Sequence, residues 1–260
     1  MRFLIFATFA VVLAGCESSG SKDPNAAMDD TARMRNPPPT DPVGITPAAI
    51  TEAMVLPEVK FKGKFQDAWK WNDALGENIL VLSTVAPYDD KAKNKDEEDG
   101  QTAEINAVQY AKKDGPFTEI WVMNEKVQAC PFDITSEFIP KSTTMTDLDK
   151  NGIAEIKLQY RLACRSDVSP AEMKLVMYEN GVKYGLVGSS WIAYSPDTKF
   201  AVKEADVNLE QLPPLKDETE AMLRSFGRYQ NEKEFAAAPA PFLPYARKEW
   251  LKYVIERTPE

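Results

Sequence analysis

The stretch Ile156-Lys157-Leu158-Gln159-Tyr160-Arg161-Leu162 alternates apolar with polar residues without a break. Successive side chains of a strand point to opposite faces of a sheet, so this alternation predicts the clearest β-strand in the chain. Two further apolar runs, Met173–Tyr178 and Val182–Val187, flank Glu179-Asn180-Gly181. Asn and Gly both tolerate positive φ, which favours a type I′ turn and predicts a hairpin.

Four more strands are predicted upstream of this stretch. Residues 59–65 alternate Val, Phe, Gly and Phe with three lysines, which indicates a half-buried strand. Asn78–Val85 is a continuous apolar run and indicates a buried strand. Thr102–Ala111 and Phe117–Lys126 are separated by a polar Gly-Pro break that suits a hairpin.

The spacing of apolar residues becomes helical after Pro213-Pro214. We expect two C-terminal helices that cover a sheet face or close a barrel end, with their aromatic side chains in the core. The predicted fold class is mainly β, as an antiparallel sheet, barrel or sandwich with two C-terminal helices, and α+β is the second choice. Residues 51–260 are predicted to form this single domain. The apolar positions are Leu215, Met222, Leu223, Phe226 and Tyr229, then Phe242, Ala246, Trp250 and Val254.

Composition excludes several function classes. The 260 residues carry a net charge of −9, which opposes binding to a phosphate backbone, so no nucleic-acid partner is expected. The chain has no histidine, so histidine-dependent nucleophile systems and His-ligated zinc are absent. No P-loop or Gly-x-Gly-x-x-Gly string is present, and nucleotide binding has no support.

The N-terminus has the features of an export signal. Arg2 precedes Phe3–Ala14, an apolar run of 12 residues that is too short for a spanning helix and suits the core of a signal peptide. The run ends in Leu13-Ala14-Gly15-Cys16, which resembles the lipobox of bacterial lipoproteins. This resemblance implies removal of residues 1–15 as a signal peptide and lipid attachment at Cys16. Glu17 in place of Asp favours the outer membrane, on its periplasmic face or at the cell surface; an ordinary secretory signal is the alternative.

Residues 16–50 are predicted to be a lipidated, flexible tether. Pro37-Pro38-Pro39 and Pro42 favour extended geometry, and the flanking residues are small and polar. An ordered arm that docks on the domain is the alternative. Through its lipid anchor, the membrane is the first expected partner of the chain.

A candidate calcium site follows the tether and the first strands: Asp147-x-Asp149-x-Asn151-Gly152-Ile153-x-Glu155. Side-chain oxygens at positions 1, 3, 5 and 9, with the Ile153 carbonyl at 7, suit a hard cation, and glycine allows the sharp turn. The loop departs from the EF-hand because its twelfth position is Leu158. It resembles the calcium loops of integrin-type FG-GAP repeats, which usually carry Asp at position nine. A metal-free turn capped by its own side chains is the alternative.

Cys130 and Cys164 are the two cysteines left once Cys16 carries lipid. Disulfides persist in exported proteins, so we predict that these two are bridged, with a buried pair of free thiols as the alternative. The pair lacks the Cys-x-x-Cys spacing of redox-active sites.

Several distinctive strings are distributed over most of residues 58–255. They resemble a family of bacterial exported proteins whose name associates it with surface polysaccharide biosynthesis. The resemblance implies a shared fold and an envelope role, and it brings no catalytic residues. The strings include WNDALGEN at 71–78, CPFD at 130–133, TDLDKNGIAE at 146–155, ACRSDVSP at 163–170 and FLPYARKEW at 242–250.

Three functions fit these features, and the sequence favours a non-enzyme without deciding the matter. The first is a lipid-anchored, calcium-stabilised module that binds glycan or an envelope protein in connection with surface polysaccharide. The second is a glycan-processing hydrolase, since two carboxylates suffice for that chemistry and Asp133, Glu137 and Asp167 lie near the predicted disulfide. The third is a small inhibitor or shield lipoprotein.

Overall fold

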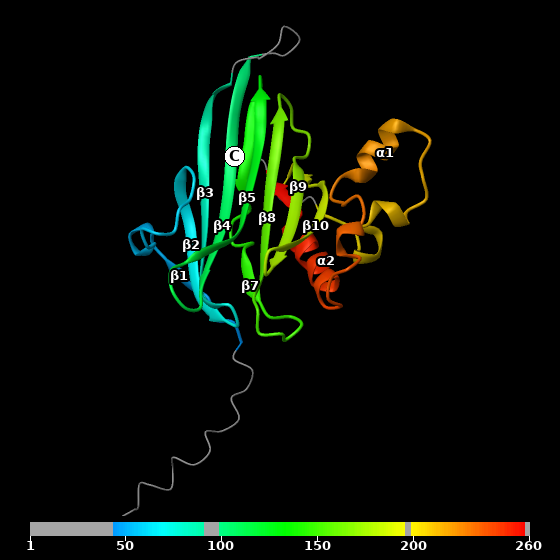
Figure 1. The fold of residues 1–260 in the computed structure, drawn as a ribbon. Helices are drawn as coiled ribbons and strands as arrows, with labels where there is room; N and C mark the ends of the chain where they lie inside the picture. The colour runs from blue at the N-terminus through cyan, green and yellow to red at the C-terminus, as the bar shows by residue number, and fades with distance from the viewer. Residues whose placement is uncertain (1–43, 91–98, 196–198, 258–260) are drawn as a thin grey trace, which may run out of the picture. The chain divides into compact units, whose positions relative to one another are not determined.

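The computed structural model describes residues 44–90, 99–195 and 199–257, and it confirms a mainly antiparallel β fold with two α-helices. Its first sheet is a meander in which each strand pairs with the next one along the chain (Figure 1). The strands are β1 (Ala48–Ile50), β2 (Lys64–Asp73), β3 (Gly76–Asp90), β4 (Gly100–Lys112) and β5 (Thr118–Cys130).

The second sheet has the order β10-β9-β8-β6, and β7 also pairs with β8. Its β9–β10 hairpin turns at Asn180 and Gly181, with φ angles of 44° and 82°. Both angles are positive, as the predicted type I′ turn requires. The strands are β6 (Asp133–Phe138), β7 (Thr144–Thr146), β8 (Glu155–Arg165), β9 (Glu172–Glu179) and β10 (Val182–Ser189).

The main hydrophobic core lies between the two sheets. Trp121 on β5 stacks on Tyr178 on β9, with ring centroids 3.9 Å apart. Ile156, Leu158 and Tyr160 of β8 belong to the same buried cluster as the apolar residues on one face of β3 and β4, which are Leu80, Leu82, Ile105 and Ala107. Neither sheet closes on itself within the described residues, so the architecture is a sandwich and the expected barrel alternative is wrong.

Helix α2 (Phe242–Tyr253) covers the outer face of the second sheet (Figure 1). Its Phe242, Ala246 and Trp250 are fully buried, which confirms the predicted core role of this helix. The polar half of β8 therefore faces a helix rather than solvent. Lys157 is completely buried and its Nζ lies 2.7 Å from Oε2 of Glu249 on α2.

Helix α1 (Glu218–Ser225) forms in the predicted region but buries none of its residues. Met222 and Leu223 are more than half exposed, so the expectation that both helices cover a sheet face is wrong for α1. The remaining elements are β11 (Trp191–Ala193), β12 (Ile255–Arg257) and the short 3₁₀ helices Glu52–Met54, Glu204–Asp206, Leu209–Gln211 and Lys233–Phe235.

Strand β12, the last one described, pairs in parallel with β11. Glu256 of β12 is buried and accepts hydrogen bonds from Arg165, the Ser190 hydroxyl and the Ala171 amide. Arg161 on β8 donates to the carbonyl oxygens of Tyr253 and Ile255 at 3.1 and 2.8 Å. Residues 253–256, near the end of the described chain, are thus tied to the second sheet.

The predicted strand over residues 59–65 is wrong for most of its length, because β2 begins only at Lys64. Residues 59–63 form a loop, and its Val59 and Phe61 pack on the outer face of the first sheet. Gly63 has φ +83°, and a Cβ there would lie 2.3 Å from the Thr84 carbonyl oxygen. The apolar alternation thus reflects packing of a loop whose path only glycine permits.

The predicted tether and the domain overlap at β1. Ala48–Ile50 pairs with residues 68–70 of β2, so the ordered domain includes the last part of the predicted tether. The predicted signal peptide, Cys16 and the tether up to residue 43 lie outside the described residues. Among the described helices, none has the length and apolar character needed to cross a membrane.

Candidate functional site

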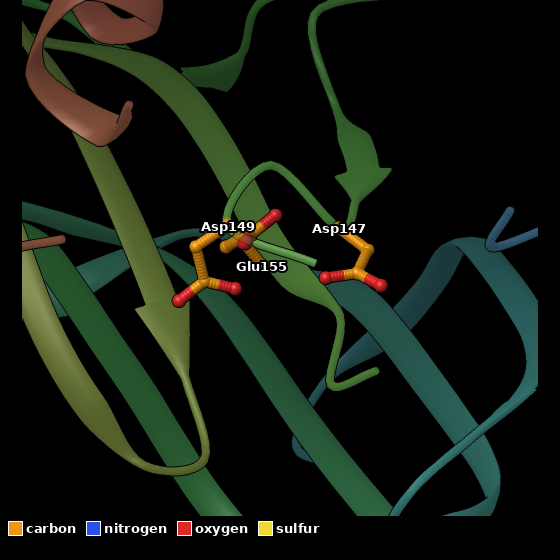
Figure 2. Close-up of side chains that lie close together, drawn as sticks. All are labelled: Asp147, Asp149 and Glu155. Atoms are coloured by element: carbon orange, nitrogen blue, oxygen red, sulfur yellow. The ribbon is translucent and has the colours of Figure 1, made fainter. Parts of the chain in front are cut away.

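The predicted calcium loop connects β7 to β8. Thr146 and Glu155 are paired across the two strands, so residues 147–154 form the connecting turn. Carboxylate oxygens of Asp147, Asp149 and Glu155 lie within 4.8 Å of one another (Figure 2). Lys150 and Gly152 have φ angles of +63° and +82°, which turn the chain back on itself and keep the acidic side chains on one loop.

Glu155 is the innermost carboxylate of this cluster. It is completely buried and accepts hydrogen bonds from the Thr146 hydroxyl and the Leu148 amide, each at 2.9 Å. Burial raises the pKa of Glu155, and these hydrogen bonds oppose that rise. The Glu155 carboxylate is therefore stabilised by uncharged hydrogen-bond donors.

Asp149 and Asn151 shape the turn. The carboxylate of Asp149 accepts from the backbone amide of Asn151 at 3.1 Å and from its side-chain nitrogen at 3.2 Å. Oδ1 of Asn151 accepts from the Ile153 amide at 2.7 Å. Among the five predicted ligands, the three carboxylates thus come together, while Oδ1 of Asn151 accepts the hydrogen bond from the Ile153 amide that shapes the turn.

Asp147 has one oxygen in use and one free. Its Oδ2 accepts from the Gly152 amide at 3.2 Å, whereas Oδ1 is buried and has no hydrogen-bond partner within the described part of the chain. No ion pair in that part involves Asp147, Asp149 or Glu155. Three close carboxylates with a spare buried oxygen form an arrangement that could bind a metal ion.

Two further acidic residues lie beside the loop, and no pattern in the sequence indicated them. Asp73, at the end of β2, accepts from the Ala154 amide at 3.1 Å, and a cavity of about 490 Å³ lies between its turn and the loop. Glu179 accepts from the Asn151 side chain at 2.7 Å. Burial raises the pKa of Glu179, and the charges of Asp149 and Asp147 raise it further. No spacing signal in the sequence relates these residues to the loop, since they come from other strands.

Cys130 and Cys164 form the predicted disulfide. Their sulfur atoms are 2.08 Å apart and their Cα atoms 5.6 Å apart. Cys130 ends β5 of the first sheet and Cys164 lies near the end of β8 in the second. The bridge therefore joins the two layers of the sandwich covalently.

None of the three carboxylates considered for a hydrolase lines the cavity beside the Asp147 loop or the hollow lined by Phe61 and Asn106. Asp133 and Asp167 are exposed, and Asp167 accepts from the Ser169 amide at 2.9 Å as a turn cap. Glu137 lies 3.6 Å from Arg161, with which it forms an ion pair. Asp167 and Glu137 thus each make a contact with a structural role.

The donor set of the Asp147 loop is made of hard oxygens only, which is the set that Mg²⁺ and Ca²⁺ prefer in proteins. No protein-family model, no curated protein and no solved structure matches this chain.

Proposed function

We propose that this chain is a lipid-anchored, non-catalytic module of a bacterial cell envelope, and that it binds glycan or an envelope partner in connection with surface polysaccharide. Calcium at the Asp147 loop stabilises the module. The observation that carries the calcium site is the cluster of Asp147, Asp149 and Glu155 carboxylates without a described cationic partner. Calcium is favoured over magnesium because an irregular loop with turn carbonyls suits its flexible coordination by six to eight oxygens.

The envelope location rests on the lipobox resemblance at residues 13–16 and is supported by the disulfide. Cytosolic thiols are kept reduced, so a bridge between Cys130 and Cys164 fits an oxidising compartment. The link to surface polysaccharide rests on the family resemblance over residues 58–255. The glycan or protein partner is to be found in the envelope.

Calcium is expected to raise the melting temperature of the protein by about 3–10 °C at about 10 mM. The expected dissociation constant is roughly 10⁻⁴–10⁻³ M, as in extracellular calcium modules, which gives about 1.4–2.7 kcal/mol of stabilisation. Asp149→Ala should abolish both this rise and the heat of calcium binding in calorimetry. Asp114→Ala, in the exposed turn after β4, is the matched control and should respond like the parent. Identical, flat titrations for the parent and Asp149→Ala would show a metal-free turn.

Acidification is expected to shrink the calcium effect. Burial raises the pKa of Glu155, so the folded protein takes up this proton at a higher pH than the unfolded chain. Without calcium, the contribution of Glu155 to stability therefore rises as the pH falls through that window. Protonation also removes a ligand, so the calcium-induced rise in melting temperature should decrease from about pH 7 to about pH 5. An equal rise at both pH values would contradict ligation by Glu155.

The anchor and the partner are tested on the native protein in detergent-solubilised envelopes. Mass spectrometry should find a chain that begins at Cys16 and carries acyl groups. Affinity capture with this protein should recover polysaccharide or an envelope protein. A native chain that retains Met1 and carries no lipid would overturn the proposed location.

A further inference from the structure

A second hollow lies on the outer face of the first sheet, where residues 59–63 cross strands β3 to β5. It is an open groove of about 260 Å³, on the opposite side of this sheet from the sandwich core. We call it the Asn106 groove. Its lining includes Phe61, Lys62, Asn106, Val108, Val122 and Asn124.

Two rows of side chains form the floor of the groove. The strand register places Ser83, Asn106 and Asn124 side by side across β3, β4 and β5. The neighbouring row consists of valines, with Val108 next to Val122. Val122 is 50% exposed although it lies in the middle of a strand, so the apolar row opens to solvent at β5. The groove thus sets an amide row beside an apolar row.

Asn106 is the side chain that needs a partner. It is only 3% exposed, and within the described residues neither its Oδ1 nor its Nδ2 makes a hydrogen bond. Its neighbour Ser83 donates to the Lys62 carbonyl oxygen at 2.6 Å. Elsewhere on β3 and β4, the buried amides of Asn78 and Gln109 bond to each other at 2.8 Å. Buried amides are normally bonded, so Asn106 leaves an unused donor and acceptor at the floor of the groove.

We propose that the Asn106 groove binds the acetamido group of an N-acetylated sugar. Such a group offers a carbonyl oxygen for Nδ2 of Asn106, an N–H for its Oδ1, and a methyl group for Val108 and Val122. In the groove, the amide of Asn106 lies beside the apolar side chains of Val108 and Val122, so the polar part and the methyl part of the acetamido group would each meet a matching surface. The inference deepens the proposed function and rests on its glycan-binding alternative.

The size and rim of the groove favour one sugar ring over an extended peptide. Its volume is slightly below the range of about 300–1,000 Å³ that encloses drug-sized ligands, which leaves room for a single small unit. The exposed Asn124 supplies hydrogen-bonding groups beside the floor. Phe61 adds an aromatic side chain at the wall, of the kind that packs against the apolar face of a ligand.

The probe is N,N′,N″-triacetylchitotriose, with cellotriose as the matched sugar that lacks acetamido groups. Saturation-transfer NMR on the full-length protein in detergent micelles should show the strongest transfer at the acetamido methyl protons and none to cellotriose. Asn106→Leu removes the amide at similar volume and should weaken binding at least about tenfold. Equal transfer to both sugars would overturn the proposal.

Two further variants separate binding from folding. Val122→Glu places a charge in the groove and should abolish binding, whereas Val182→Glu, at the similarly exposed Val182 on β10, should leave it unchanged. The melting temperature of Asn106→Leu should be unchanged or higher, because the substitution removes an unpaired buried amide. Loss of binding in Val182→Glu, or retained binding in Val122→Glu, would overturn the proposal.

The peptide alternative is tested with glycyl-glycyl-glycinamide, which has backbone amides but no acetyl group. Binding of this peptide at least as tight as that of the trisaccharide would assign the groove to peptides and overturn the sugar proposal. If neither probe binds while the native protein still captures envelope polysaccharide, the groove inference fails and the proposed function stands. If the trisaccharide binds but the native chain carries no lipid, the groove inference stands and the proposed location fails.

Discussion

Replacement of Glu249 by alanine is expected to destabilise the domain by about 3–5 kcal/mol. Glu249 is the acidic partner of Lys157, which is completely buried between the second sheet and α2. Burial lowers the pKa of Lys157 to about 8, and the hydrogen bond and charge of Glu249 counteract that fall. In the variant the pKa of Lys157 falls further, and within the described part of the chain the contact left to stabilise its charge is the Tyr253 ring, 4.7 Å from Nζ. Urea unfolding followed by fluorescence measures the loss.

Two controls show whether the buried charge causes the loss. Lys252→Ala removes the exposed lysine that also contacts Glu249 and should cost less than about 1 kcal/mol. The double variant Lys157→Met with Glu249→Leu removes both charges and should be close to the parent in stability, or more stable. A loss below about 1 kcal/mol for Glu249→Ala would mean that Lys157 reaches solvent, contrary to its burial.

Removal of the disulfide by the double variant Cys130→Ser and Cys164→Ser is expected to destabilise the protein by about 3–4 kcal/mol. The bridge closes a loop with a sequence separation of 34 residues, and opening it gives the unfolded chain more conformations. The loss should appear as a lower urea midpoint. The parent protein under reducing conditions serves as the control and should show the same midpoint as the variant.

A disulfide that contributes to the fold makes the reduced and oxidised forms differ. Equal urea midpoints for the oxidised parent and the double serine variant would contradict the prediction. Because Cys130 and Cys164 belong to different sheets, removal of the bridge should also lower the activation barrier for separation of the two sheets during unfolding. Faster unfolding of the variant in stopped-flow measurements is the expected kinetic sign.

Much of the sandwich could be predicted because its strands carry local signals. The hairpin at Asn180-Gly181 and the alternation in β8 depend on neighbouring residues, and both were correctly placed. The burial of Lys157 could not be predicted, because its partner Glu249 lies 92 residues further along the chain. The exposure of Met222 and Leu223 was missed for a similar reason, since helical spacing does not say whether a surface awaits the helix.

The candidate sites show the same division. The three carboxylates of the Asp147 loop were predicted from spacing within nine residues, and the structure brings them together. Asp73 meets the loop only because the end of β2 lies against it, 81 residues away from its partner Ala154. The Asn106 groove arises from the register of three strands and one crossing loop, which no local pattern encodes.

The hydrogen bonds of Glu256 have a consequence for the order in which the domain matures. Arg165 and Glu256 are 91 residues apart, and Glu256 lies on β12, the last of the described strands. A nascent chain cannot make this contact until Glu256 has left the ribosome. In the proposed export to the envelope, Arg165 of the second sheet would therefore lack this partner until residue 256 has also crossed the membrane.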